Sequence, residues 1–245
     1  MSADVVVTGR RAVAEAVKAG RALEVLVDRG ARATQGMRAV LDAARAAGVT
    51  VRTVPRADLD RFEADHRGVV ARVGDVAGRE LSERDLASFG FADDAFVIVL
   101  DGIEDPQNLG ASARTAEASG AVMLVSRTRR AAPVTPAAVR ASAGALLHLP
   151  HARVANITKA IGRLQEAGFF VVGLDGDAEA TVYDEPCPPG RVAIVLGAEG
   201  TGLSRLVRER CDALVSLPMR GRVASLNASA ALAATLYSYV VPGRR

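Results

Sequence analysis

The pattern of apolar and polar positions divides the chain into two blocks, in which short apolar runs alternate with amphipathic segments. Runs of about four to eight apolar residues are typical of strands, and apolar residues spaced three and four apart are typical of helices. In the first block the pattern predicts strands at residues 5–7, 23–27, 49–54 and 69–73, and helices at 11–19, 35–47 and 57–62. We therefore expect an α/β domain over residues 1–73.

The second block, residues 96–245, repeats the alternation over a longer stretch. Its apolar runs predict strands at residues 96–101, 122–126, 169–174, 192–197 and 213–217, and its amphipathic segments predict helices at 108–119, 136–143, 156–166, 203–209 and 226–240. Apolar strands that alternate with helices indicate a mostly parallel sheet covered on both faces. Between the blocks, residues 74–95 hold scattered Gly, Ser and acidic residues, which indicate a linker with one helical turn near 83–87.

Composition places the chain among globular proteins. Of its 245 residues, 49% are apolar, which is enough to bury a core. The apolar runs are shorter than a membrane span, and the first ten residues lack a signal-peptide pattern, so we expect a soluble cytoplasmic protein. Cys187 and Cys211 are far apart and have no metal-ligand spacing, and Pro150 separates His148 from His151. We therefore expect two reduced thiols and no metal site.

The placement of charge leaves the kind of partner open. Residues 1–75 carry a net charge of +3, residues 76–95 carry −3, and residues 96–245 carry +3. Only Lys18 and Lys159 are lysines, and arginine suits bidentate contacts with phosphate. A genome biased toward arginine codons would give the same composition, so the charge is compatible with RNA binding without requiring it.

Three clusters of small and polar residues follow predicted strands, which is where ligands bind in open parallel sheets. The first, residues 105–114, reads DPQNLGASAR. Asn108 could cap the next helix, and Gly110 would leave the helix N-terminus open to an anion. Arg114 lies on the same helix, and its side chain would lean toward that end. An ordinary capped helix with a surface arginine is the alternative.

The second cluster, residues 195–202, reads VLGAEGTG. Its glycines would let a ligand lie against the backbone, but they do not match the dinucleotide fingerprint. Glu199 is its only charge, and it could instead be an exposed residue of a simple turn. The third cluster, residues 217–229, reads LPMRGRVASLNAS, and it leads polar Ser225 and Asn227 into an alanine-rich helix. Both side chains could be helix caps.

The three clusters together resemble the three motifs of the SpoU (TrmH-like) branch of the SPOUT RNA methyltransferases. Their order and spacing cover residues 96–245. In the first block, VTGRRAV near the start and HRGVV at 66–70 are similar to the L30e-like RNA-binding domain that precedes the catalytic domain in some members. The whole chain resembles those members that 2′-O-methylate a guanosine near the peptidyl-transferase centre of 23S rRNA. It departs from them at Arg11, which replaces a His, at Arg67, which replaces a Gln, and at Ala228, which replaces a Val.

The resemblance implies a C-terminal domain with a deep trefoil knot that binds S-adenosylmethionine and works as a homodimer. The cofactor contacts it implies are Gly197, Gly200, Leu217, Met219 and Leu226. The reaction centre would contain Asn108, Arg114, Glu199, Ser225 and Asn227, with Arg114 close to the partner's cofactor. For RNA contacts we select Arg10, Arg11, His66, Arg67, Arg127, Arg129 and Arg130, although the arginines after the strand at 122–126 could also form a solvated loop.

The family mechanism makes the arginine at this position the general base. A guanidinium stays protonated in proteins, so we favour Arg114 as the group that positions the ribose and stabilises the developing oxyanion. Asn108 and Glu199 would orient it, and a substrate phosphate would accept the proton. Methylation of tRNA or of another rRNA site, as in antibiotic-resistance enzymes, is the nearest alternative. A non-catalytic RNA-binding or assembly protein is the more distant one, and the intact polar residues of the three motifs argue against it.

Overall fold

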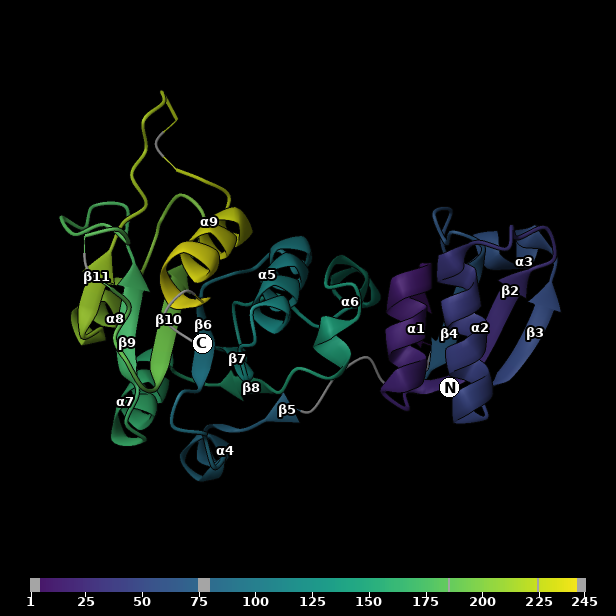
Figure 1. Cartoon of the computed structure of the whole chain (residues 1–245), viewed down its shortest axis with the longest axis horizontal. Helices are drawn as coiled ribbons and strands as arrows, with labels where there is room; N and C mark the ends of the chain where they lie inside the picture. Colours follow the sequence, from purple (N-terminus) through teal and green to yellow (C-terminus); the bar gives the residue numbers. More distant parts are fainter. Residues whose placement is uncertain (1–4, 75–79, 185, 224, 242–245) are drawn as a thin grey trace. The chain divides into compact units, whose positions relative to one another are not determined.

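The computed structural model describes residues 5–74, 80–184, 186–223 and 225–241, which form two compact units (Figure 1). The first unit comprises the described residues up to 74 together with Pro133–His148, and the second comprises Glu80–Ala132 and the described residues from Leu149 onward. Part of the predicted linker, residues 75–79, lies outside the described residues. The predicted α/β class is confirmed in both units.

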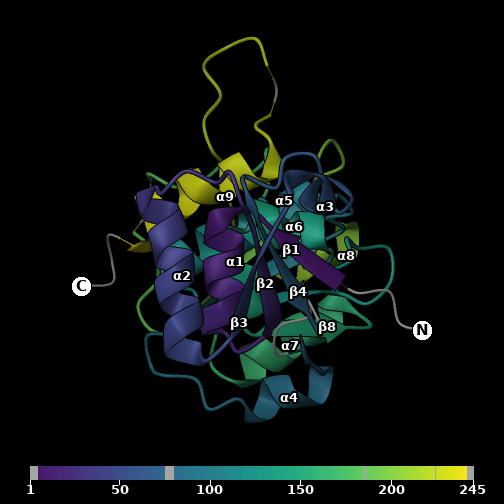
Figure 2. The same ribbon diagram turned by 90° about the vertical axis from the view of Figure 1, so that its right-hand side faces the viewer.

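The first unit is built on a four-stranded mixed sheet in the order β1-β4-β2-β3. Only β2 and β3 run parallel, and β4 is antiparallel to both of its neighbours. Helices α1 and α2 lie side by side (Figure 2), while Leu59 of α3 packs on Leu26, Val54 and Val70. The elements are β1 (Val5–Thr8), α1 (Arg10–Lys18), β2 (Ala22–Asp28), α2 (Gln35–Ala47), β3 (Thr50–Val54), α3 (Arg56–Asp60) and β4 (Val69–Val73).

One segment of the second sequence block packs in the first unit. It contains α6 (Pro136–Ala141) and a 3₁₀ turn (Ala145–Leu147), which contact β1 and α1. Arg140 forms an ion pair with Glu63 and donates a hydrogen bond to Thr8 Oγ1 (3.4 Å). The compact units therefore differ from the two sequence blocks in this segment, and the predicted domain bounds stay predictions.

The second unit contains a seven-stranded sheet in the order β11-β9-β10-β6-β7-β8-β5, and all its strand pairs are parallel. Short β5 and β8 were not predicted, because a two-residue strand and a strand that starts at a histidine lack a clear apolar run. The strands are β5 (Glu80–Leu81), β6 (Phe96–Asp101), β7 (Met123–Arg127), β8 (His151–Val154), β9 (Phe170–Leu174), β10 (Val192–Gly197) and β11 (Ala213–Val215).

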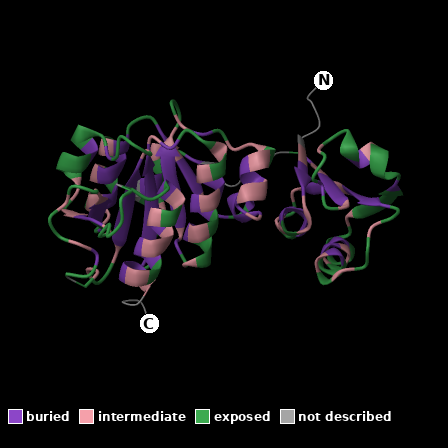
Figure 3. Cartoon of the chain, turned by 90° about the horizontal axis from the view of Figure 1, so that it is seen from above, coloured by how far each residue is buried: buried purple, intermediate pink, exposed green. Residues whose placement is uncertain are grey.

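Helices cover both faces of this sheet, as predicted. Val97, Val99 and Val195 share a core with helices α4, α7 and α8. The alternate positions Ile98 and Ile194 are equally buried and turn to the other face, where α5 and α9 pack on each other. Figure 3 shows the buried strands of this sheet between helices whose outer turns are exposed. These helices are α4 (Glu83–Ser88), α5 (Pro106–Ala118), α7 (Ile157–Glu166), α8 (Arg205–Arg210) and α9 (Ala228–Thr235), which continues as a π-helical turn (Leu236–Val240).

Two helix starts differ from the prediction. Helix α5 begins at Pro106, and its N-cap is Asp105, whose Oδ1 accepts a hydrogen bond from the Gln107 N–H (3.1 Å). Asn108 is therefore not the cap but lies in the first turn, which leaves its side chain available for other contacts. Helix α9 begins at Ala228 because Asn227 caps it, so Leu226 and Ser225 belong to the preceding loop. The predicted knot stays a prediction.

Within the described part of the chain, no helix is long and apolar enough to cross a membrane.

A fully buried histidine lies where β7 and β8 meet. His151 Nε2 is 2.8 Å from Ser126 Oγ, and Nδ1 has no hydrogen-bond partner among the described residues. Burial, with the charge of Arg153 as a second cause, lowers the pKa of His151 from 6.5 to about 3. The imidazole is therefore neutral in the folded protein at every pH near neutrality.

This histidine makes the stability depend on pH. Below about pH 6.5 the unfolded chain protonates His151 but the folded chain does not, so its contribution is complete above that pH and falls as the pH drops towards 3. At pH 5 the loss is about 2 kcal/mol. Urea unfolding at pH 7.5 and pH 5 measures it, with the apolar pair Ser126→Ala/His151→Leu as the reference. We expect wild type to lose about 2 kcal/mol more than this reference. Equal losses would contradict the assignment.

Candidate functional site

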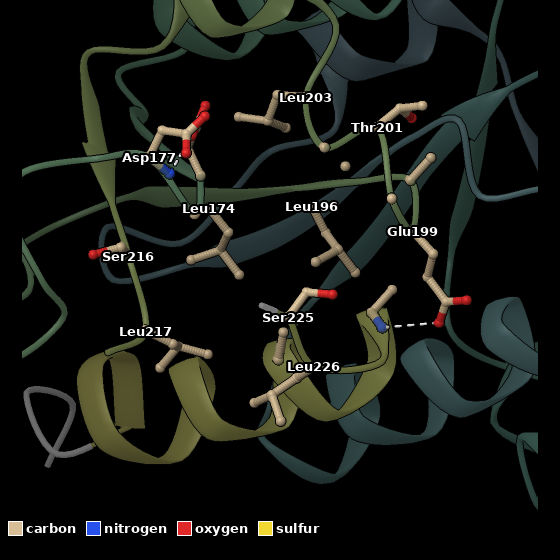
Figure 4. A pocket seen from close by; sticks show the side chains of 18 of the residues that line it. Leu174, Asp177, Leu196, Glu199, Thr201, Leu203, Ser216, Leu217, Ser225 and Leu226 are labelled. Carbon is tan, nitrogen blue, oxygen red and sulfur yellow. Dashed lines mark hydrogen bonds between the residues drawn. The ribbon is translucent and has the colours of Figure 1, made fainter. Parts of the chain in front are cut away.

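A pocket of about 750 Å³ opens at the carboxyl ends of β9, β10 and β11, which are neighbours in the sheet. Its lining includes five predicted cofactor residues and two predicted reaction-centre residues (Figure 4). Pockets of a few hundred to about a thousand Å³ hold ligands of cofactor size. The predicted residues that line it are Gly197, Glu199, Gly200, Leu217, Met219, Ser225 and Leu226.

One wall of the pocket is a tight turn over residues 197–204, which we call the glycine loop. Ala198 and Gly202 exchange two backbone hydrogen bonds (3.1 and 2.9 Å), which fold the loop onto itself. Gly200 and Gly202 have positive φ values of 76° and 64°. A Cβ atom on Gly197 would lie 2.2 Å from the carbonyl carbon of Gly202, so only glycine fits there. At its three glycines the loop therefore presents backbone to the pocket.

A hydrogen-bonded cluster joins the three sequence motifs beside the pocket. The Asn227 side-chain amide donates hydrogen bonds to Asn108 Oδ1 (2.9 Å) and to Glu199. Glu199 also accepts the backbone N–H of Ala228 (3.2 Å), at the start of α9, where a negative charge is favourable. Asn227 Oδ1 meanwhile caps α9 by accepting the N–H of Ser229 (3.0 Å). Asn227 is thus both a cap and the link between the motifs.

Arg114 is not part of this cluster. Its side chain is exposed on α5, it does not line the pocket, and it forms no hydrogen bond or ion pair with another described residue. It lies six positions after Asn108, which places the two side chains about 120° apart around the helix. A single chain therefore joins three of the five predicted reaction-centre residues in one cluster, places Ser225 on the pocket wall and leaves the arginine on an open helix face.

Comparison with known proteins shows the family of this chain. Residues 95–237 match the SpoU rRNA Methylase family, and residues 6–76 match a domain described as RNA 2′-O ribose methyltransferase substrate binding. The chain belongs to the SpoU family. A 23S rRNA (guanosine-2′-O-)-methyltransferase from Salmonella typhimurium is 38% identical over 220 residues, which cover 89% of this chain and 89% of that protein. An uncharacterized tRNA/rRNA methyltransferase from Mycolicibacterium vanbaalenii is 40% identical over 234 residues, which cover 94% and 74%.

Two solved structures extend the likeness to nearly the whole chain. The SpoU methyltransferase AviRb from Streptomyces viridochromogenes, in complex with AdoMet, has a TM-score of 0.76 and 29% identity, covering 98% of this chain and 90% of that one. A crystal structure of an RNA 2′-O ribose methyltransferase has a TM-score of 0.80 and 27% identity, covering 98% and 88%.

The predicted RNA contacts of this SpoU chain divide between the two units. In the first unit Arg11 and Arg67 are exposed, and Arg10 Nε donates a hydrogen bond to the Arg67 carbonyl (3.2 Å). His66 differs from the prediction, because its side chain is fully buried, with Nε2 3.1 Å from Asp60 Oδ1 and Nδ1 accepting the Gly68 N–H (2.9 Å). It cannot reach RNA in this structure. It orders the loop on which Arg67 sits with a positive φ of 54°.

In the second unit the predicted contacts lie on residues 127–132, which we call the basic loop. Arg129 and Arg130 are exposed and form no hydrogen bond or ion pair with other described residues. Arg153 fixes the backbone of the loop, because it donates hydrogen bonds to the carbonyls of Thr128 and Ala132 (both 3.4 Å). Arg127 instead turns inward, and its Nη2 lies 2.5 Å from Asp101 Oδ1. The basic loop thus offers two free guanidinium groups, not three.

Sequence reasoning missed the residues that follow β9. Asp175, Gly176 and Asp177 line the pocket, and Arg208 forms an ion pair with Asp175 (3.0 Å). The signal was present, because a polar turn follows an apolar strand, but only the strand order shows that β9 lies beside β10.

Thiol and metal chemistry receive no support from the described residues. Burial, followed by the nearby carboxylates of Asp212, Asp101 and Asp175, raises the pKa of the Cys211 thiol to about 12, so this thiol stays protonated. Within the described ranges, no group of three or more His, Cys, Asp or Glu side chains is placed to hold a metal ion.

Proposed function

We propose that this chain transfers a methyl group from S-adenosylmethionine to the 2′-hydroxyl of a guanosine in 23S rRNA. The observation that carries the proposal is the pocket at the ends of β9, β10 and β11, with the three-motif cluster of Asn108, Glu199 and Asn227 at its side. The similarity to a 23S rRNA (guanosine-2′-O-)-methyltransferase over 89% of both chains supports the substrate. A cytoplasmic site of action is part of the same proposal.

The pocket residues fit the cofactor. A ligand can lie on the backbone of the glycine loop at its glycines, which line the pocket. The tight turn of this wall requires Gly197, because a Cβ there would collide with the backbone of Gly202. Leu217, Met219 and Leu226 supply apolar contacts from the opposite wall, and Gly200 leaves the turn open. When bound, S-adenosylmethionine supplies an electrophilic methyl group on a sulfonium. The side chains of this chain then have to bind, orient and activate the ribose.

In the proposed mechanism, the cluster fixes polar groups at the edge of the pocket. Asn227 is held from both sides, by its cap of α9 and by Glu199, so its amide and that of Asn108 are preorganised. Ser225, also on the pocket wall, adds a hydroxyl that can donate or accept. Arg114 remains protonated, positions the ribose and stabilises the oxyanion that forms as the hydroxyl loses its proton. A phosphate of the substrate takes up that proton.

The position of Arg114 supports a homodimer in which each site uses residues of both chains. Arg114 lies on the exposed face of α5, next to α9, where Ala230 is also exposed. Tyr237 is exposed in the π-helical turn that continues α9. Tyr237 donates a hydrogen bond to the carbonyl of Ala118 (3.2 Å) and so continues this face along both helices. We propose that a second copy covers the face and receives Arg114 at its own pocket.

The test is a map of 2′-O-methyl groups in ribosomal and transfer RNA from cells of the source organism with and without the gene. We expect one 2′-O-methylguanosine to disappear from 23S rRNA. Wild-type chain should restore it, and the Asn227→Ala variant, expressed at the same level, should not. Loss of a 2′-O-methyl group from tRNA instead would show that tRNA is the substrate, and the proposed methyl transfer would stand. Unchanged maps of both RNAs would overturn the proposed function.

A further inference from the structure

A buried carboxylate lies directly beneath the glycine loop. Asp101 is the last residue of β6, it pairs in register with Gly197 of β10, and only 3% of its surface is exposed. Both of its carboxylate oxygens are engaged. Oδ2 accepts the backbone N–H of Ser204 (2.9 Å), and Oδ1 lies 2.5 Å from Arg127 Nη2.

Strand β6 holds both ends of the glycine loop. Gly197, the first residue of the loop, is held by the β6–β10 ladder, and Ser204, the last, is held by Asp101. Gly102 follows Asp101 with a positive φ of 84°, and a Cβ there would touch Ala198 at 3.5 Å. The start of the connection to α5, which bears Asn108, therefore lies against the same loop.

Arg127 supplies the positive charge that pairs with the Asp101 carboxylate in this position. An isolated buried carboxylate is costly, and pairing with a guanidinium offsets that cost. Arg127 Nε is buried and has no hydrogen-bond partner among the described residues, so this part of the guanidinium faces the protein and not solvent. Its geometry differs from that of Arg129, two residues along the same basic loop, which is exposed.

We propose that Asp101 and Arg127 are positioning residues for the cofactor site, and that Arg127 acts through Asp101 and not by contact with RNA. This inference rests on the proposed function of the pocket. Asp101 holds the glycine loop in the shape that accepts the cofactor, and Arg127 holds Asp101. The pair couples the end of β7, where the basic loop begins, to the wall of the pocket.

The experiment compares Asp101→Asn, Arg127→Gln and, as matched control, Arg129→Gln. Calorimetry measures the affinity of the 245-residue chain for S-adenosylhomocysteine. Kinetics give the KM for RNA, the salt dependence of that KM, and kcat at saturating cofactor. Thermal unfolding checks that each variant is folded. We expect Asp101→Asn and Arg127→Gln each to lower the affinity for S-adenosylhomocysteine about tenfold, a loss within the range of coupling energies between residues in contact. The KM for RNA should stay unchanged. Arg129→Gln should leave the affinity for S-adenosylhomocysteine unchanged and raise the KM for RNA. The salt dependence of RNA binding should become shallower, because one phosphate contact is lost.

The double variant Asp101→Asn/Arg127→Gln should bind no more weakly than the weaker single variant, because both changes act on one contact. The inference would be overturned if Arg127→Gln bound S-adenosylhomocysteine as tightly as wild type and raised the KM for RNA as Arg129→Gln does. Should Asp101→Asn fail to fold, Arg127→Gln and Arg127→Lys decide the question, and we expect lysine to restore part of the affinity. Wild-type protein that binds no S-adenosylhomocysteine would overturn the proposed function itself.

Discussion

Replacing Gly197 by alanine is expected to abolish cofactor binding while the sheet stays folded. The new Cβ would lie 2.2 Å and 2.3 Å from the carbonyl carbon and oxygen of Gly202 and 2.4 Å from the nitrogen of Leu203. These are backbone atoms, so no side-chain rotation can relieve the clash, and the glycine loop has to open. Since the loop forms one wall of the pocket, we expect affinity for S-adenosylhomocysteine to fall by at least about 100-fold.

Gly221 provides the matched control for this substitution. It lies in the loop between β11 and α9, which projects from the second unit (Figures 1 and 2), and a Cβ there would meet nothing within 4 Å. Gly221→Ala makes the same chemical change without a clash, so its affinity should stay within about twofold of wild type. Calorimetry measures binding, and far-ultraviolet circular dichroism checks the fold. Gly197→Ala that binds like Gly221→Ala would show that the glycine loop is not the cofactor wall.

A mixed dimer of two inactive variants is expected to recover activity. Arg114→Ala and Asn227→Ala should each lower kcat by about 100- to 1000-fold. This is the usual loss when a group that stabilises a developing oxyanion, or a group that positions it, is removed. If Arg114 serves the partner's pocket, a heterodimer of the two variants contains one site with both residues intact. Coexpression with two affinity tags and sequential purification yields this heterodimer, and it should show about half of the wild-type activity.

The control for the mixed dimer reverses the arrangement. A chain that carries both Arg114→Ala and Asn227→Ala, paired with a wild-type chain, leaves each shared site with one missing residue, so this heterodimer should be inactive. If each chain instead used its own arginine, the control would retain half of the activity and the first heterodimer would have none. The two measurements together therefore separate a shared site from a site within one chain.

Much of the second unit could be predicted from residues close together in the sequence. Apolar runs at 96–101 and 192–197 are long and unbroken, as expected of strands buried on both faces, and both form strands over those bounds. The glycine pattern at 197–202 indicated a backbone-lined turn, and the structure adds why Gly197 tolerates no side chain. The end of α5 was predicted almost correctly, whereas its start was not, since Asp105 and Pro106 also form a good helix start.

The sequence by itself determined the α/β class, the alternation that makes the large sheet parallel, and the three motifs that identify the family. Local propensity and hydrophobic periodicity are sufficient for these. Tertiary structure alone decided which motif residues meet: Asn227 joins Asn108 and Glu199 from 119 and 28 residues away, while Arg114 stays apart on an exposed helix face. It also turned two predicted RNA contacts inward, His66 to Asp60 and Arg127 to Asp101. The physical reason is that the direction of a side chain depends on strand order and burial, which no local pattern contains.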